Sequence, residues 1–320
     1  MNELPSVKDS SIINDMRLPD EFTNNTFSNF KKTQVKNEME KCMLNGKLEP
    51  ACFWCCELIC SGHFSEIWET ILHFIGKYIH IANPKLCIYV EKRFLLFKSI
   101  ISNQDLVNEL QLRNHPTIRI MFAEIVSILT YSNKKHSYEI VKINKKDEYD
   151  ITQMTERLIA PNVHYVDDIF LKEDPKELFI AMNELSYNLS TGESNFHNAC
   201  YWVEWIIEFE AICKKRKMPC KCEPRPFVKL ESKFRTQSVW IIWDILYHHV
   251  SKKENPFFLK IVQSLLSLFC IKYTYSTPKR RRFLLYFAIA IITENCDLKT
   301  DMIKSKKNIE NVLININKLY

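Results

Sequence analysis

Apolar residues recur at spacings of three and four along most of the chain, which predicts a protein built from amphipathic α-helices. The clearest example follows Ser65, a candidate helix cap, and its apolar positions share one face: Ile67, Trp68, Ile71, Leu72 and Ile75. This helix is predicted over Glu66–His80. The other helices up to residue 131 are predicted over the ranges Thr33–Leu44, Ala51–Cys60, 86–101, 104–112 and 116–131. The predicted fold class is therefore all-α.

The same pattern suggests a domain organisation. Residues 1–33 lack sustained periodicity and are expected to form a flexible N-terminal arm, followed by a first helical half over 34–131. Residues 132–174 form a charged connector, in which the alternation of Tyr138, Ile140 and Ile143 is compatible with a small hairpin. A second helical half then covers 175–320, opened by Asp174-Pro175 in the cap-then-proline manner of helix starts.

Two stretches of the chain are similar to each other. Residues 37–59 read NEMEKCMLNGKLEPACFWCCELI, and residues 183–207 read NELSYNLSTGESNFHNACYWVEWII. Both contain Asn-Glu, a break marked by glycine, and Ala-Cys-aromatic-Trp at the start of an apolar helix. Downstream, Ile67-Trp68 is echoed by Ile242-Trp243 and Asn83-Pro84 by Asn255-Pro256. We infer two related helical halves, the second of which carries a basic, cysteine-containing insertion at 213–239.

Composition excludes several classes of enzyme. Average usage would place roughly 22 glycines in a chain of this size, but the 320 residues contain 4. Neither the P-loop motif nor the dinucleotide-binding G-x-G-x-x-G is present, and G-x-S-x-G and H-E-x-x-H are also absent. Asp244 and His248 lie four residues apart, which fits a pair on a helix surface. The sequence therefore predicts a protein that is not an enzyme, with no catalytic residues.

Cysteine usage and the N-terminus bear on location. The chain has 12 cysteines, but Met1–Asp20 is polar and carries acids, which predicts no signal peptide and hence reduced thiols. The longest apolar run, Phe283–Ile292, is too short to span a bilayer. We expect a cytoplasmic protein without a membrane span, placed in the host cytoplasm or a viral factory if it is viral, or else in the virion.

Two cysteine groups are candidate metal sites. Cys52, Cys55, Cys56, Cys60 and His63 follow one face of a single helix, where four ligands rarely converge, so core packing is favoured. In the insertion, Cys213, Cys220 and Cys222 would make a structural zinc site with a distant histidine: His197, His248 or His249. Because no second C-x-x-C supplies the usual spacing, an ordinary basic loop without a cofactor is the favoured alternative.

Two runs of cations are the candidate nucleic-acid-binding residues: Lys214, Lys215, Arg216 and Lys217, and Lys279, Arg280, Arg281 and Arg282. Such runs would contact phosphates in a salt-sensitive manner that does not depend on sequence. The alternative is a solvated helix end, where cations are also favoured by the helix dipole. The net charge of +6 and the pI of 8.6 fall short of the strongly basic footprint of nucleic-acid-binding domains. The six tryptophans lie in apolar helical runs and are interpreted as core anchors rather than base-stacking residues.

One segment resembles a known family. Ala51, Trp54, Leu58 and Gly62, followed by Ile79–Pro84, are similar to the helical C-terminal collar of clamp-loader-type AAA+ ATPases, over about residues 51–86. The ATPase module of that family is absent from the sequence. In the family the collar forms oligomers, so the resemblance implies self-association or protein partners rather than catalysis.

The chain is also rich in Lys, Asn, Ile and Tyr, and in this it resembles uncharacterised proteins of nucleocytoplasmic large DNA viruses. Together these features predict a non-enzymatic scaffold or accessory subunit of viral-type DNA replication or packaging machinery, which contacts nucleic acid through its basic runs. The alternative is a minor capsid or other virion structural protein, in which the basic runs would be incidental.

Overall fold

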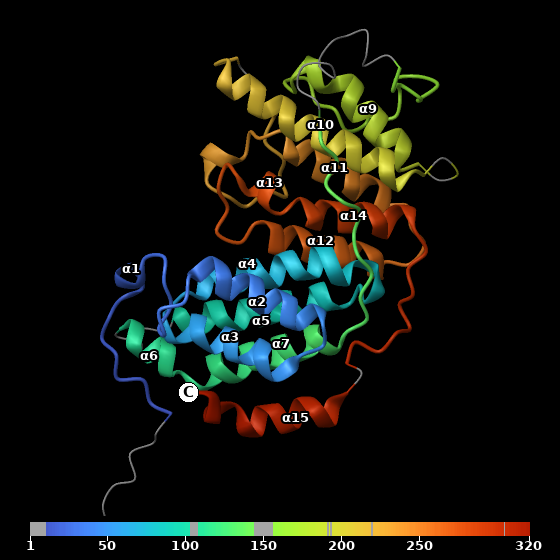
Figure 1. Cartoon of the computed structure of the whole chain (residues 1–320). Coiled ribbons are helices and arrows are strands. Elements are labelled where there is room, and N and C mark those ends of the chain that lie inside the picture. The colour runs from blue at the N-terminus through green and yellow to red at the C-terminus, as the bar shows by residue number, and fades with distance from the viewer. Residues whose placement is uncertain are drawn as a thin grey trace, which may run out of the picture. The chain divides into compact units, whose positions relative to one another are not determined.

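The prediction of an all-α fold is confirmed by a computed structural model, which describes residues 11–102, 108–143, 156–190, 192, 194–218, 220–303 and 305–320 (Figure 1). In the described part of the chain no strand forms, and the one isolated β-bridge joins Asn25 and Lys31. The small hairpin that the alternation of Tyr138, Ile140 and Ile143 allowed does not form over the described residues 138–143, and 144–150 lie outside the described residues. Just before this segment, the Ser137 N–H donates to the Lys77 carbonyl at 2.7 Å.

The chain divides into two compact units that do not follow its order. Unit 1 comprises Met1–Ile75, Tyr89–Lys134 and Lys299–Tyr320, and unit 2 comprises Gly76–Ile88 and Lys135–Leu298. The collar-like stretch is therefore shared between the units, because the chain passes from unit 1 to unit 2 at Gly76. The duplication of two halves and their boundaries at 34–131 and 175–320 stay predictions.

Unit 1 is built around the apolar helix α3 (Leu48–Cys60). Its neighbours are α2 (Lys32–Leu44), α4 (Phe64–Phe74) and α7 (Pro116–Tyr131), and the unit also contains α1 (Pro19–Phe22), most of α5 (Leu86–Ile101), α6 (Glu109–Asn114) and α15 (Lys306–Asn315). A cluster of aromatic side chains joins α4, α5 and α7, with ring centroids 5.3 to 6.2 Å apart: Phe64, Trp68, Phe97 and Phe122. The rings of α5 and α7 thus pack against the apolar face of α4 that its three-and-four spacing predicts.

The cysteines of α3 behave as small apolar core residues. Cys52, Cys55, Cys56 and Cys60 are all buried, and burial raises the pKa of the Cys55 thiol. His63 lies next to the backbone of another segment, with Nε2 3.3 Å from the Asn25 carbonyl oxygen. The packing interpretation of this group therefore fits its surroundings.

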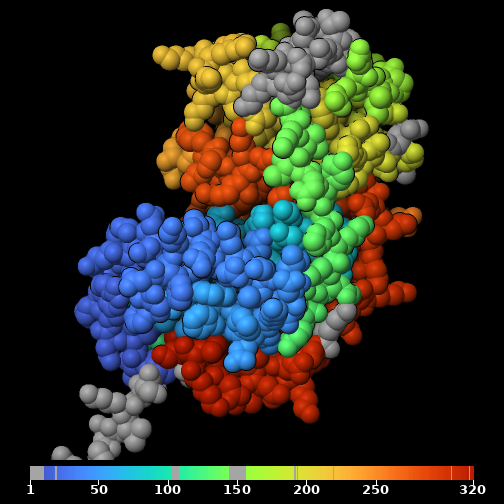
Figure 2. All heavy atoms as spheres, viewed as in Figure 1, coloured from blue at the N-terminus to red at the C-terminus, as the bar shows by residue number. Residues whose placement is uncertain are grey.

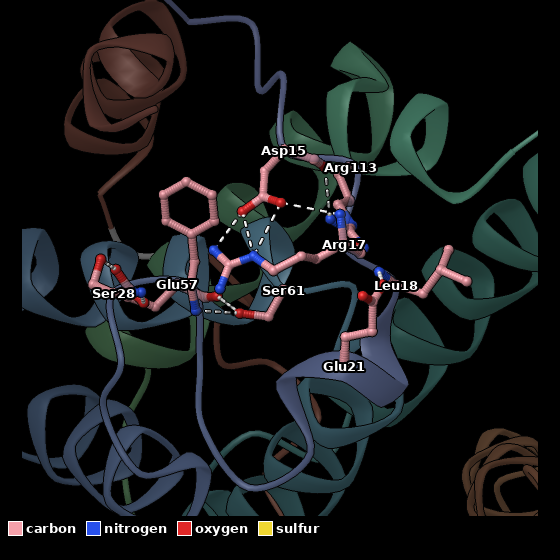
Figure 3. A network of polar contacts seen from close by, with 9 residues as sticks. Asp15, Arg17, Leu18, Glu21, Ser28, Glu57, Ser61 and Arg113 are labelled. Carbon is pink, nitrogen blue, oxygen red and sulfur yellow. Dashed lines mark hydrogen bonds and ion pairs between the residues drawn. The ribbon is translucent and has the colours of Figure 1, made fainter.

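The described part of the N-terminal arm, residues 11–33, is bound to the helices of unit 1 rather than loose. The Asn114 side-chain amide brackets Ile13, accepting from its N–H at 2.8 Å and donating to its carbonyl at 2.9 Å. Arg113 donates to the carbonyls of Asp15 and Arg17 (Figure 3). A polar segment without periodicity shows no packing signal, so the sequence did not reveal these bonds to helix ends.

The buried carboxylate of Glu57, in α3, fixes the second part of the arm. It accepts a hydrogen bond from the Thr26 hydroxyl at 2.9 Å. It also accepts one from the Ser28 hydroxyl at 2.5 Å (Figure 3). Nearby, the Ser61 hydroxyl accepts from the Phe27 N–H at 2.8 Å. Hydrogen bonds of this kind compensate the cost of burying a charged group.

Unit 2 is built around α14 (Arg282–Thr293), in which every residue from Phe283 to Ile292 is buried. It packs against α10 (Phe196–Lys215), α11 (Val239–Ser251) and α12 (Phe257–Phe269). The unit is completed by η1 (Ile75–Ile79), which begins in unit 1, and by η2 (His80–Ala82), η3 (Lys176–Leu178), α9 (Phe179–Asn188), η4 (Ser232–Phe234) and α13 (Thr277–Arg280). A Cβ atom on Gly76 would lie 2.9 Å from the backbone of Phe283, so glycine allows η1 to approach the start of α14.

Both copies of the internal repeat fold as a pair of packed helices, α2 with α3 and α9 with α10. Their tryptophans differ in environment. Trp202 is 1% exposed, whereas Trp54 is half-buried and meets Phe30 edge-on at 5.2 Å between ring centroids. Asn83 is buried and Asn255 is exposed, so the Trp54/Trp202 and Asn83/Asn255 pairs do not occupy equivalent surroundings.

Candidate nucleic-acid interface

The insertion at 213–239 concentrates the positive charge of the chain. It contains nine Lys and Arg residues and two Glu residues, while the whole chain has a net charge of +6, so the rest of the chain is nearly balanced. Eight of the nine cations are exposed to solvent: Lys214, Lys215, Arg216, Lys217, Lys221, Lys229, Lys233 and Arg235. The modest pI of the chain therefore conceals a local concentration of charge.

Helix α10 presents the first basic run. The Asn195 side chain caps its start by accepting from the Asn198 N–H at 3.0 Å, and its first half is buried. The helix then leaves the core and ends in Lys214 and Lys215, where the dipole favours cations. In Figures 1 and 2 this end of α10 (gold) projects from the surface of unit 2. The run is thus held on a helix and surrounded by solvent.

The ninth cation, Arg225, anchors the loop that follows. Its guanidinium is 1% exposed and lies 2.5 Å from Asp174 Oδ2 and 2.9 Å from Asp244 Oδ2. Burial alone would lower the pKa of Arg225, but the hydrogen bonds and charge of these carboxylates outweigh it and raise the pKa above its usual value. Asp174 also accepts from the Glu223 N–H at 2.9 Å. These bonds tie the loop to α11 and to the segment before η3.

Two of the three cysteines of the insertion, Cys213 and Cys220, are hydrogen-bond partners of each other, whereas Cys222 has partners elsewhere. Cys222 donates to the Gln237 carbonyl at 3.0 Å, and Cys220 Sγ lies 3.6 Å from the Ser238 hydroxyl. Burial raises the pKa of Cys220 and of Cys222 to about 12. Cys213 is buried at the end of α10.

The histidines named for the fourth zinc ligand have other neighbours. The His197 ring lies 4.2 Å from the Tyr138 ring, and His249 Nε2 is 2.8 Å from the Ser186 hydroxyl. His248 lies beside His249, with ring centroids 5.5 Å apart. Among the residues with described positions, no group of three or more Cys, His, Asp or Glu side chains is arranged to hold a metal.

The second basic run contributes mainly to the fold. Arg281 is 4% exposed, and its Nη1 donates to the Phe269 carbonyl at 2.7 Å and to the Ile271 carbonyl at 2.5 Å, at the end of α12. Lys279 pairs with Glu208 at 2.5 Å, and Arg282 pairs with Glu204 at 3.0 Å. Arg280 is the exposed member of the run. The side chains of Lys279, Arg281 and Arg282 are therefore engaged in bonds within the protein.

Glu204 is the buried centre of this arrangement. Burial raises the pKa of its carboxyl, and this is opposed by the Arg282 charge and by the Tyr286 hydroxyl, which donates to Glu204 at 2.8 Å. Because Glu204 and Glu208 both belong to α10, their ion pairs fix α13 and the start of α14 against the helix that carries the first run.

Tyr275 lies beside two parts of the insertion, the end of α10 and η4. It is 49% exposed, and the ammonium of Lys214 lies 4.5 Å from its ring centroid. The Tyr275 hydroxyl donates to the Lys233 carbonyl at 3.0 Å, and the Phe234 ring meets it edge-on at 5.0 Å. We call Lys214–Lys217, Lys233 and Tyr275 the basic-aromatic patch. Sequence reasoning did not find Tyr275; its position three residues before Pro278 and close to a basic run was the available signal.

The residues considered for catalysis make structural contacts. Asp244 binds Arg225, and burial lowers the pKa of His248. The hydroxyl of Ser186, close to His249, belongs to a side chain that is fully buried and donates to the Tyr165 carbonyl at 2.8 Å. A nucleophile in that position is not accessible to a substrate.

Comparisons with known proteins found no matching family model, no similar curated protein and no similar solved structure. Within the described part of the chain, none of the helices has both the length and the apolar character that crossing a bilayer requires. The resemblances to the clamp-loader collar and to proteins of large DNA viruses stay predictions.

Proposed function

We propose that this chain is a non-enzymatic helical scaffold or accessory subunit that contacts nucleic acid through the insertion at 213–239. The observation that carries the proposal is the exposure of eight cations in this one segment, in a chain whose remaining charge is nearly balanced. Lys and Arg bind phosphates by displacing condensed counterions, and this contact needs exposed cations more than a defined cleft.

The proposal assigns different roles to the two basic runs. Lys214–Lys217 contact phosphates, together with the neighbouring exposed cations of the insertion. Lys279, Arg281 and Arg282 support this surface from within, since their partners are carboxylates and carbonyls of the protein itself. Arg280 is the exposed member of the second run.

The collar-like stretch at 51–86 supports a role in assembly with DNA replication or packaging machinery, and the lysine- and asparagine-rich composition supports a viral setting. In such a complex, the insertion would hold nucleic acid while the helical units contact protein partners or further copies of the chain. The mode of binding would be independent of base sequence, because phosphate contacts carry no sequence information.

The test is a salt titration of affinity by fluorescence anisotropy with a labelled duplex, for the wild-type chain and two matched triple variants. Lys215→Ala/Arg216→Ala/Lys217→Ala removes three exposed cations of the insertion, and Lys47→Ala/Lys92→Ala/Lys98→Ala removes three exposed cations of unit 1. We expect the first variant to lower the slope of log K against log salt by about 2.7, from a loss of about 0.9 per phosphate contact, and the second to leave it unchanged.

Absence of binding at low salt would overturn the proposal, and the virion structural role would then be the function to pursue. An equal loss in both triple variants would also contradict it, because the affinity would then follow net charge and not the insertion.

A further inference from the structure

We propose that Tyr275 is a base-stacking residue, so that the basic-aromatic patch takes single-stranded nucleic acid in preference to duplex. This inference rests on the proposed function and specifies the ligand of the same surface. It adds a contact to the base, which phosphate binding alone does not provide.

The ring of Tyr275 is held in place although about half of it is exposed. Its hydroxyl is bonded to the Lys233 carbonyl, and its edge is supported by Phe234, itself 8% exposed. The backbone around it is also fixed, because Thr277 accepts from the Thr274 N–H at 2.9 Å and donates its own N–H to the Thr274 carbonyl at 3.0 Å. A ring that is already ordered loses little conformational entropy when a base stacks on it.

Lys214 marks the accessible face of the ring. Its ammonium lies 4.5 Å from the centroid, so a cation now occupies the position that a planar base would take. Cation–π contacts at exposed sites contribute only about 0.5–1 kcal/mol, whereas base stacking contributes about 1–3 kcal/mol per base. A base can therefore replace the ammonium, which would move to the phosphate of the same nucleotide.

The other exposed aromatic side chains in the described residues have different surroundings. Phe53 meets Trp54 at 5.0 Å and Tyr138 meets His197 at 4.2 Å, and neither ring has a Lys or Arg positioned over it. Tyr273, two residues before Tyr275, is 7% exposed and donates to Gln237 at 2.8 Å. Tyr275 thus combines exposure with a cation of α10 over its ring and a hydrogen bond from its hydroxyl to the Lys233 carbonyl in η4. The ammonium of Lys233 pairs with Glu231 at 2.7 Å.

This geometry favours a single strand over a duplex, because the Tyr275 ring can reach the face of a base only where the base is not already stacked on both sides. In a duplex both faces of each base are already stacked, so the ring would have to unpair the helix before it could contact a base. In a single strand the bases are free to turn toward the ring while Lys214–Lys217 follow the backbone phosphates. Stacking tolerates every base, so the preference concerns strandedness and not sequence.

The experiment compares three labelled probes by anisotropy at fixed moderate salt: oligothymidylate, oligouridylate and a mixed-sequence duplex, each about 20 nucleotides long. We expect tighter binding of both single strands than of the duplex. Tyr275→Ala should weaken single-strand binding about tenfold or more and leave duplex binding unchanged. Tyr275→Phe keeps the ring and should bind as the wild type does.

Two further measurements keep the outcome unambiguous. Tyr275→Leu preserves apolar packing against Phe234 without an aromatic face, so it should reproduce the loss seen for Tyr275→Ala even if the alanine variant is unstable. Salt titration of Tyr275→Phe and Tyr275→Leu should give equal slopes, because no cation is removed.

Equal affinity for single strands and duplex, together with unchanged binding by Tyr275→Leu, would overturn the stacking inference and leave phosphate binding by the insertion in place. Failure of every probe to bind at low salt would overturn the proposed function as well. A loss of duplex binding in Tyr275→Leu equal to the loss of single-strand binding would also contradict base stacking, since it would indicate damage to the whole patch.

Discussion

The two basic runs are alike in sequence and differ in structure. Each consists of four consecutive cations beside an apolar helix. Lys214–Lys217 follow the buried part of α10, and all four are exposed to solvent. Lys279–Arg282 instead link α13 to α14, and three of their four side chains bind partners within the protein. A run of cations thus indicates charge, while its position relative to the core decides what the charge does.

The difference arises from where each run falls along its helices. The first comes at the end of α10 and just beyond it, where all four cations are exposed to solvent. The second lies in a tight connection between α13 and the buried α14, facing the carbonyl end of α12 and the acidic side chains of α10. Cations in the second setting are required by the fold, because they neutralise groups that folding takes out of water.

Among the variants that test this comparison, Arg281→Ala should have the largest effect on the free energy of unfolding. Replacement by alanine leaves the carbonyls of Phe269 and Ile271 buried without this donor, and we expect a loss of about 3 kcal/mol in the free energy of unfolding. Arg280→Ala, at the exposed neighbouring position, should change it by no more than about 0.5 kcal/mol. Urea unfolding of both variants measures the difference, and equal losses would show that Arg281 does not have the structural role described here.

A smaller effect, with a distinctive pH dependence, is expected for Arg282→Ala. This variant leaves Glu204 buried without its ion-pair partner, at a cost of about 2 kcal/mol near neutral pH. The pKa of Glu204 in the folded protein already lies above its ordinary value because of burial, and removal of Arg282 raises it further. An acid whose pKa is raised by folding loses stability as the pH rises from its unfolded pKa through its folded pKa.

The deficit of Arg282→Ala relative to the wild type should therefore shrink as the pH is lowered toward the ordinary glutamate range, near about 4.3. Thermal unfolding at about pH 5 and about pH 8 measures it. In a Glu204→Gln background the pH dependence of the Arg282→Ala effect should disappear. A deficit that is constant with pH would mean that the variant acts through packing and not through the charge of Glu204.

Much of the fold could be predicted from the sequence, because its helices carry strong periodic signals. The predicted ranges Thr33–Leu44 and 86–101 agree with α2 (Lys32–Leu44) and α5 (Leu86–Ile101). The predicted helix Glu66–His80 is α-helical only to Phe74 and continues as η1 and η2, since apolar spacing does not distinguish an α-helix from a π or 3-10 turn. The alternation of the two units along the chain and the binding of the N-terminal arm depend on contacts between distant residues. Periodicity carries no signal for such contacts.

For the candidate site, the sequence identified the charges and not their surroundings. Lys214–Lys217 were found and are exposed, but Arg281 was grouped with them although it is buried. The three insertion cysteines share a loop-like segment in the sequence, whereas Cys222 is bonded to the backbone near Gln237. The apolar periodicity does not distinguish Tyr275 from a core aromatic residue. Each difference comes from contacts with other elements of the fold, for which the sequence pattern carries no signal.

The smallest expected effect on stability is that of Lys279→Ala, and its comparison with Lys215→Ala separates a role in folding from a role in binding. Lys279 pairs with Glu208 but is 39% exposed in its side chain, so Lys279→Ala should cost no more than about 0.5 kcal/mol of stability. Because its ammonium is directed to a carboxylate, its removal should leave the salt slope of duplex binding unchanged. Lys215→Ala should do the reverse, lowering that slope by about 0.9 without altering the urea midpoint. If Lys279→Ala lowered the slope as much as Lys215→Ala, the second run would also contact phosphate in the complex. The two runs would then differ only in their contribution to the stability of the fold.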